Sequence, residues 1–264
     1  MANVSSYLNS LANYLWALAP GSCTPPSIQP RLIAHRGAHG RGIKENTLKA
    51  FDICLQMGVW GIELDIHLTR DAEPVIHHDP DCGQPFNRPD LIIADTNFNT
   101  LRQAIPDIPH LDEVVARYGG QLHLMLEIKS SWRDRAELPH RITESLSSLT
   151  PVKDYHLLSL VPDHLEGFSQ IPPAAFVDVA ETNTGEIIRQ NLALGHGAVA
   201  GSFALITTTN LRQLQQAGKQ VGTGMVENHA ILNREAYRGV DWIFTDHILS
   251  LLPEADKQHK QRNR

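Results

Sequence analysis

Short aliphatic runs alternate with longer stretches of helical periodicity through most of the chain after residue 30. Strands that alternate with helices in this way are typical of βα units and a parallel sheet. The helical stretches are Asn46–Met57, Leu111–Tyr118, Ala136–Leu149, Gly185–Asn191, Thr209–Ala217 and Ile231–Tyr237. The runs predicted as strands are Arg31–His35, Gly61–Leu68, Pro74–His77, Leu122–Ile128, His156–Leu160, Ala174–Val177, Ala198–Ala200, Gln220–Gly222 and Trp242–Thr245.

The number of these units indicates a barrel. About eight βα units in ~235 residues suit a (β/α)8 barrel, whose usual length is ~250 residues. Nine strands are predicted, so at least one lies outside the barrel, and Ala198–Ala200 has the weakest pattern. The stretch from Asp79 to Gln121 is too long for a simple βα connection and predicts an excursion over one barrel mouth. The predicted fold class is α/β, a TIM (β/α)8 barrel with a small insertion between the third and fourth strands.

The two ends of the chain differ from this pattern. Residues 1–30 are predicted to form an amphipathic helix at 5–18 and a Pro-rich linker, TPPSIQP. That helix could pack on the domain, on a partner or at a membrane surface, and packing on the domain is favoured. Residues 31–252 form the predicted barrel domain, and 253–264 are predicted to be a basic flexible tail.

Composition excludes several classes of function. The formal charge of −6 argues against nonspecific nucleic-acid binding, which needs a basic surface. No apolar run approaches the ~20 residues of a membrane span. Three scattered cysteines do not form a disulfide framework or a zinc site, which favours a reducing, cytoplasmic location. Peripheral membrane association through residues 5–18 stays open, and the oligomeric state is not predicted.

Acidic side chains lie on one face of two predicted strands. In GIELDIHL, the period of two puts Glu63, Asp65 and His67 on the face opposite the aliphatic side chains, and in LHLMLEIK it pairs Glu127 with Lys129. Carboxylates at i and i+2 lie roughly 6–7 Å apart, and their repulsion is on the order of 2–3 kcal/mol at an effective dielectric of ~20. A hard cation such as Mg²⁺ or Ca²⁺ would relieve it. The alternative is an exposed acidic face of an edge strand.

The first strand ends in a basic pair followed by glycine, in LIAHRG. His35 could transfer a proton near neutral pH, and Arg36 could hold a phosphate with its fork of donors. In the following KENTLKAF, Asn46 or Thr47 could cap the next helix. Capping and ligand contact stay equally open for Asn46, and Glu45 could serve the helix dipole or the site.

Five segments together resemble the glycerophosphodiester phosphodiesterase family. They occur in the family's order and span about 215 residues of this chain, as expected for one (β/α)8 domain. The resemblance implies a TIM barrel that holds one divalent cation, Mg²⁺ or Ca²⁺ with Mn²⁺ also allowed, and a small-molecule phosphodiester as substrate. The segments are IAHRG at 33–37, ENTLKAF at 45–51, GIELDIHLTRDAEPVIHHD at 61–79, LEIK at 126–129 and GVDWIFTD at 239–246.

The resemblance also implies a role for each matching residue. The family's His-Asp pair selects His78 over His77, with Asp79 orienting a histidine and Asn46 as a further candidate. The implied sites are two catalytic histidines (His35 and His78, base and acid in either order), three metal ligands (Glu63, Asp65 and Glu127) and two phosphate-binding residues (Arg36 and Lys129).

The implied reaction is hydrolysis of glycerophosphodiesters to glycerol 3-phosphate and an alcohol. In the family, a neighbouring glycerol hydroxyl attacks first and gives a cyclic phosphate. The chain departs from the family pattern at VGTGMVEN (221–228), where Trp-Thr-Val-Asn is usual, at DPDCGQPFNRPD (79–90), which lacks Arg-Thr-Thr, and at His110, where Thr is usual. Two alternatives therefore stay open: a lysophospholipase D reaction at the same site, and a barrel that binds a phosphorylated ligand without turnover.

Overall fold

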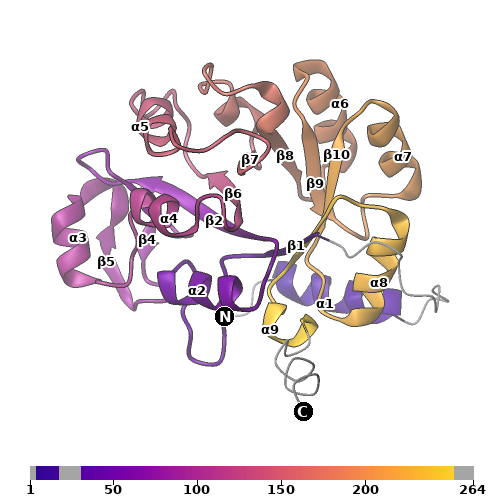
Figure 1. The fold of residues 1–264 in the computed structure, drawn as a ribbon, viewed down its shortest axis with the longest axis horizontal. Coiled ribbons are helices and arrows are strands. Elements are labelled where there is room, and N and C mark those ends of the chain that lie inside the picture. Colours follow the sequence, from indigo (N-terminus) through magenta and orange to yellow (C-terminus); the bar gives the residue numbers. More distant parts are fainter. Residues whose placement is uncertain (1–3, 18–30, 253–264) are drawn as a thin grey trace, which may run out of the picture.

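A closed barrel of eight parallel strands forms the body of the protein (Figure 1). The structure is a computed structural model that describes residues 4–17 and 31–252. The predicted linker at 18–30 and the predicted tail at 253–264 lie outside the described residues. Around the barrel the strand order is β1 (Arg31–Ala34), β11 (Trp242–Thr245), β10 (Gln220–Gly224), β9 (Ala198–Ser202), β8 (Phe176–Ala180), β7 (Tyr155–Ser159), β6 (His123–Ile128) and β2 (Gly61–Leu68), and β2 pairs with β1 to close it.

Helices lie outside this ring and cover the strands (Figure 1). Between β7 and β8 the connection contains only the 3₁₀ turns Pro162–Leu165 and Pro173–Ala175. The predicted TIM-barrel fold is therefore confirmed. The helices that follow the strands are α2 (Leu48–Gln56), α4 (Leu111–Tyr118), α5 (Leu138–Ser145), α6 (Thr184–Leu194), α7 (Thr208–Gln216), α8 (His229–Arg238) and α9 (Ile248–Leu251).

One predicted strand lies outside the barrel, and it is not the one with the weakest pattern. Ala198–Ser202 is the barrel strand β9, paired on both sides, whereas β3 (Pro74–Ile76) runs antiparallel to β2. Counted by barrel strands, the insertion therefore lies between the second and third. It holds more regular structure than predicted, namely β4 (Asp81–Cys82), β5 (Arg88–Ile92), a 3₁₀ turn at Ile93–Asp95 and α3 (Phe98–Ala104), before α4.

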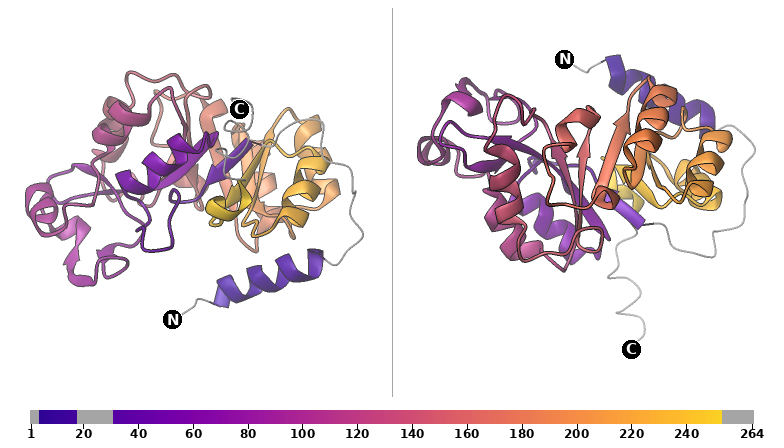
Figure 2. Two further views of the ribbon diagram at one scale, coloured as in Figure 1. Left: turned by 60° about the horizontal axis from the view of Figure 1, so that its bottom comes forward. Right: turned by 90° about the horizontal axis from the view of Figure 1, so that it is seen from above.

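Several predicted boundaries shift by a few residues. The strand predicted at Ala174–Val177 begins at Phe176, because Pro173–Ala175 form a 3₁₀ turn. The helix predicted at Ala136–Leu149 covers only Leu138–Ser145. The helix predicted at 5–18 is present as α1 (Val4–Ala17), which lies against α8 at the edge of the barrel (Figures 1 and 2).

Side chains on alternate positions of the strands form two apolar layers. The outer layer packs between the sheet and the helices and includes Ile62, Leu64 and Ile66 of β2. The inner layer fills the barrel and consists of small and medium side chains with Trp242 and Phe244. Glu63 and Asp65 share the inward parity, so the barrel interior carries their carboxylates toward the end where the strands finish.

Candidate active site

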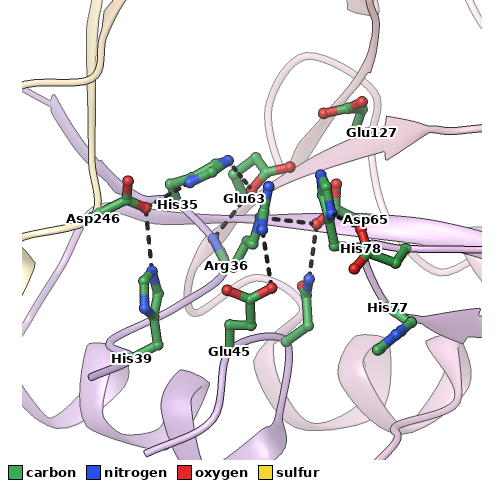
Figure 3. Close-up of polar contacts among 12 residues, drawn as sticks. His35, Arg36, His39, Glu45, Glu63, Asp65, His77, His78, Glu127 and Asp246 are labelled. Atoms are coloured by element: carbon green, nitrogen blue, oxygen red, sulfur yellow. Dashed lines mark hydrogen bonds and ion pairs between the residues drawn. The ribbon is translucent and has the colours of Figure 1, made fainter. Parts of the chain in front are cut away.

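Three carboxylates from two neighbouring strands converge at one mouth of the barrel (Figure 3). Glu63 and Asp65 stand on β2, and Asp65 lies opposite Glu127 in the register of β2 with β6. One oxygen from each of these three side chains lies within 4.8 Å of the others. Glu63 is 2% exposed and Asp65 is fully buried. The predicted acidic face is thus an interior cluster, and the edge-strand alternative is excluded by the pairing of β2 on both sides.

The burial of these carboxylates perturbs their titration. Burial and the charge of Asp65 raise the pKa of Glu63 to about 8. Burial acts in the same sense on Asp65, but the charges of Lys129 and Arg36 outweigh it and hold the pKa of Asp65 below its ordinary value. A buried carboxylate that keeps its proton near neutral pH is a strong candidate to exchange that proton for a metal ion.

The cluster fits a hard divalent cation. Oε1 of Glu63 is buried and accepts no hydrogen bond among the described residues, whereas the buried Oδ1 of Asp65 has the ammonium of Lys129 at 3.0 Å. Carboxylate oxygens without sulfur ligands are what Mg²⁺ and Ca²⁺ prefer. The donor set of Glu63, Asp65 and Glu127 therefore suits an ion of this kind, and the chemistry of the set does not distinguish Mg²⁺, Ca²⁺ and Mn²⁺.

A tight turn after β1 places Arg36 against this cluster. The backbone N–H of Arg36 donates to Oε2 of Glu63 at 3.1 Å, and its guanidinium lies 2.9 Å from Glu45 and 3.4 Å from Asp65. The backbone of Arg36 has a φ of 55°, which is uncommon for a residue with a side chain. Gly37 follows with a φ of 82°, and a Cβ there would lie 2.8 Å from Phe51, so only glycine fits.

Asn46 contacts the cluster rather than the helix. Its Nδ2 donates to Oδ2 of Asp65 at 2.8 Å, and the side chain is 2% exposed. The cap of α2 is instead Thr47, whose hydroxyl accepts from the N–H of Ala50. The sequence leaves helix capping and ligand contact open for Asn46. In the structure its side chain contacts Asp65, a candidate metal ligand, and does not cap α2.

Lys129 directly follows β6 at the same mouth. Its Nζ is 3.0 Å from Oδ1 of Asp65 and 2.8 Å from Oε1 of Glu127. These two carboxylates raise the pKa of Lys129 against the opposing effect of burial, so it stays cationic. The positive charge of Lys129 offsets part of the negative charge of Asp65 and Glu127. It also lies at the entrance, where an anionic ligand would meet it.

His35 is held by a carboxylate that the sequence analysis missed. Its Nδ1 lies 2.7 Å from Oδ1 of Asp246, the residue directly after β11, and its Nε2 faces Oε2 of Glu63 at 3.8 Å. His39 shares the same Asp246 oxygen at 3.2 Å. Burial favours the neutral ring, but Glu63 and Asp246 together raise the pKa of His35 to about 9. A position at the end of a barrel strand was the available signal for Asp246.

His78 and His77 turn in different directions, as Figure 3 shows. Nδ1 of His78 lies 2.7 Å from Oδ1 of Asp79, and its partly exposed ring lies beside Asp65. His77 is buried, and its Nε2 donates to the backbone carbonyl of Asp81 at 2.9 Å. Two histidines with Nδ1 held by a carboxylate, His35 and His78, thus flank the acidic cluster.

Comparison with known proteins agrees with this geometry. The sequence model of the glycerophosphoryl diester phosphodiesterase family matches residues 35–250. The chain belongs to this family. It is therefore a phosphoric diester hydrolase, and the segment matched runs from the candidate histidine His35 to α9.

Relatives of the family cover almost the same stretch. YhdW of Bacillus subtilis (strain 168) is 26% identical over 235 residues, 82% of this chain and 94% of that protein. The fold is shared with a Thermotoga maritima glycerophosphodiester phosphodiesterase, at a TM-score of 0.71 and 22% identity over 83% of this chain and 96% of that one. It is also shared with an Oleispira antarctica phosphodiesterase in complex with the product sn-glycerol-3-phosphate, at a TM-score of 0.72 and 22% identity over 84% and 95%.

Two departures from the family pattern have a structural account in this glycerophosphoryl diester phosphodiesterase. His110 replaces a threonine, and its Nδ1 accepts from the N–H of Asp112 to cap α4, as a threonine hydroxyl would. Its Nε2 donates to Glu73 at 3.0 Å. The substitution preserves the cap, so it affects the scaffold and not the candidate site.

The second departure, at 221–228, is covered by α1. Asn13 is 2% exposed, donates to the carbonyl of Met225 at 3.0 Å and accepts from the N–H of Glu227 at 3.0 Å. Asn9 donates to the side chain of Glu227 at 2.7 Å. The N-terminal helix therefore fixes the loop after β10, at the same end of the barrel as the carboxylate cluster. No helix among residues 4–17 and 31–252 is long and apolar enough to cross a membrane.

Proposed function

We propose that this enzyme is a metal-dependent phosphodiesterase that hydrolyses glycerophosphodiesters to glycerol 3-phosphate and an alcohol. The observation that carries the proposal is the pair of carboxylate-held histidines, His35 and His78, on either side of the three-carboxylate cluster. Membership of the family and the product bound to the Oleispira antarctica relative support the substrate class.

Proton transfer in this reaction falls to the Nε2 atoms. Because Nδ1 of His35 is committed to Asp246 and Nδ1 of His78 to Asp79, Nε2 is the free nitrogen of each ring. One Nε2 takes the proton of the attacking glycerol hydroxyl, and the other protonates the alcohol oxygen as its bond to phosphorus breaks. The products of this step are a cyclic phosphate and the free alcohol. Water then opens the cyclic phosphate, with the two histidines in exchanged roles, and gives glycerol 3-phosphate.

The phosphate itself is negatively charged and needs positive partners. Arg36 and Lys129 are the cations at the mouth, and each lies against Asp65 on one side with part of its surface exposed. They would bind the phosphate oxygens and stabilise the charge that develops as the new bond forms. A cation held by Glu63, Asp65 and Glu127 would supply Lewis-acid stabilisation of the same charge.

A substrate panel tests this proposal. Glycerophosphocholine, glycerophosphoethanolamine and lysophosphatidylcholine should be assayed with each of Mg²⁺, Ca²⁺ and Mn²⁺, and with a chelator. We expect metal-dependent release of glycerol 3-phosphate, which Glu63→Gln and Asp65→Asn should reduce at least ~100-fold while leaving the fold intact. His35→Asn and His78→Asn should lose activity by ~10²–10⁴-fold and keep the metal. If no phosphodiester is turned over under any condition, the non-catalytic binding barrel replaces this proposal.

One observation favours lysophospholipids as a second substrate class. The face of α1 that turns away from the barrel exposes Leu11, Tyr14 and Leu15 at 53%, 64% and 50%, and the helix has no charged side chain. A helix that packs on a domain normally turns its polar face outward. An uncharged apolar face beside the mouth would suit a zwitterionic lipid surface. Co-sedimentation with phosphatidylcholine vesicles would support this hypothesis if a Leu11→Ser/Leu15→Ser variant loses it. Failure of the native protein to bind the vesicles would exclude the hypothesis.

A further inference from the structure

The third inward side chain of β2, His67, lies two residues beyond Asp65. Its Nε2 is 3.0 Å from the backbone oxygen of His78. A carbonyl oxygen only accepts, so Nε2 of His67 carries the proton of this hydrogen bond.

The main chain at His78 lies just beyond the end of β3. Strand β3 ends at Ile76, and the last backbone bond to β2 runs from the N–H of His77 to the carbonyl of Asp65 at 3.0 Å. After His77 the chain leaves the sheet. There the hydrogen bond from the side chain of His67 to the backbone oxygen of His78 replaces the next backbone contact between β3 and β2. Strand β2 thus holds both the carboxylate of Asp65 and the main chain of His78.

From this geometry we propose that His67 is a positioning residue, which holds the backbone of His78 at a fixed place relative to Asp65 so that the His78 imidazole meets the substrate oxygen. The inference rests on the proposed function, in which His78 transfers a proton. A rigid strand that carries both a ligand residue and the donor for a catalytic residue fixes their spacing. A displacement of about 1 Å in such a group can cost ~100-fold in rate.

Three substitutions separate this role from simple packing. His67→Leu removes the donor at similar bulk. His67→Asn keeps a polar side chain that is too short to reach, and it serves if the leucine variant fails to fold. His67→Gln is the matched control, because its Nε2 can donate from nearly the same place as the Nε2 of histidine.

The readout is the turnover number and KM for two substrates with the same glycerol 3-phosphate half. One carries a p-nitrophenol leaving group and the other an alkyl alcohol, because the need for an acid depends on how basic the leaving group is. We expect His67→Leu and His67→Asn to lower the turnover number by ~10- to 100-fold with KM within about 2-fold. For both variants, the turnover number with one substrate divided by that with the other should match the same ratio for His78→Ala and differ from that for His35→Ala. The turnover number of His67→Gln should stay within about 3-fold of that of the native enzyme.

Two outcomes would overturn the inference. The first is native turnover in both His67→Leu and His67→Asn. The second is a loss that His67→Gln shares in full or that follows the pattern of His35→Ala. If instead His78→Ala itself has native activity, the proposed function fails. The two failures are therefore distinguishable in one experiment.

Discussion

Asp65 shows how a single buried carboxylate is held at this mouth. One of its oxygens accepts from Asn46 at 2.8 Å and lies 3.4 Å from Arg36, and the other lies 3.0 Å from Lys129. A buried charge is tolerated only with partners of this kind. Arg36 and Asn46 reach Asp65 from the connection between β1 and α2, and Lys129 reaches it from the end of β6, so each side chain can be removed separately to test its contribution.

Lys129→Met should separate metal binding from phosphate binding. The substitution removes a positive charge 3.0 Å from Asp65 and 2.8 Å from Glu127, so Mg²⁺ should bind roughly 5-fold more tightly or better. Activity should nevertheless fall at least ~100-fold, because the phosphate loses a cation in the transition state. Isothermal titration calorimetry and kcat/KM would measure the two effects, with Lys153→Met as a surface control. Weaker metal binding with unchanged kcat/KM would contradict the assignment of Lys129.

Asn46 offers a matched pair of substitutions, because its backbone has a φ of 53°. Both Asn46→Ala and Asn46→Gly delete the amide that donates to Asp65, and we expect each to weaken metal binding ~10- to 100-fold. The alanine variant should in addition be less stable than the glycine variant, by about 1 kcal/mol in the free energy of unfolding, because alanine tolerates positive φ poorly. Metal titration and urea unfolding measure the two quantities. Native metal affinity in both variants would mean that the amide only satisfies the fold.

The sequence predicted the acidic residues of the site better than their partners. The period of two on β2 and β6 was enough to bring Glu63, Asp65 and Glu127 together, because parity is a local property. The contact of His35 with Asp246 joins residues 211 positions apart. No local pattern encodes such a contact, and the bond from His67 to the backbone of His78 depends on where β3 ends. These partners can be identified only from the three-dimensional structure.

At the scale of elements, the error over β9 and β3 has a physical cause. Strand β9 is AVAGS, with small side chains because the barrel is narrow there: a Cβ on Gly201 would lie 2.9 Å from the carbonyl of Ala180. Small residues give a weak strand pattern. The PVI of β3 gives a strong one, but its proline lacks an N–H, which suits a short antiparallel strand at the edge.

Asn13 is a buried polar contact of α1 with the barrel, beside the apolar packing of Ala12 and Trp16 on the core. Asn13→Ala would leave the N–H of Glu227 without its partner and would remove one of the two donors to the carbonyl of Met225, which Asn9 also contacts at 3.2 Å, at a cost of about 2 kcal/mol. Amide hydrogen exchange of residues 4–17 should accelerate ~10-fold or more, while that of the barrel strands stays native. Tyr14→Ala is the control, because Tyr14 is 64% exposed. Equal exchange in both variants would contradict this role of Asn13.

Across the whole molecule, the two ends of the barrel interior differ in charge. The mouth carries the carboxylates and cations of the site, whereas the opposite end holds a neutral histidine pair beneath the apolar inner layer. Nδ1 of His123 donates to the carbonyl of Lys153 at 3.1 Å, so its Nε2 accepts from Nδ1 of His156 at 2.8 Å. Trp60 stacks on His123, and Trp242 packs against His156.

This histidine pair should make the fold sensitive to acid. Burial lowers the pKa of His123 to about 4 and that of His156 to about 3, below the ordinary 6.5. Between pH 6.5 and 4 the unfolded chain therefore binds more protons than the folded one, so stability is full above pH 6.5 and falls as the pH drops. At pH 4.5, each ring should have lowered the free energy of unfolding by an amount on the order of 2–3 kcal/mol relative to pH 7.

A His123→Leu/His156→Leu variant measures that contribution directly. Urea unfolding at pH 7 and pH 4.5 gives the change in the free energy of unfolding for the native chain and for the variant, and the difference between the two changes isolates the pair from other titrating groups. We expect the native chain to lose several kcal/mol more than the variant, because leucine does not titrate. Lost packing against Trp60 and Trp242 lowers the variant's stability equally at both pH values, so it cancels. An equal loss in both chains would show that the pair does not govern acid unfolding.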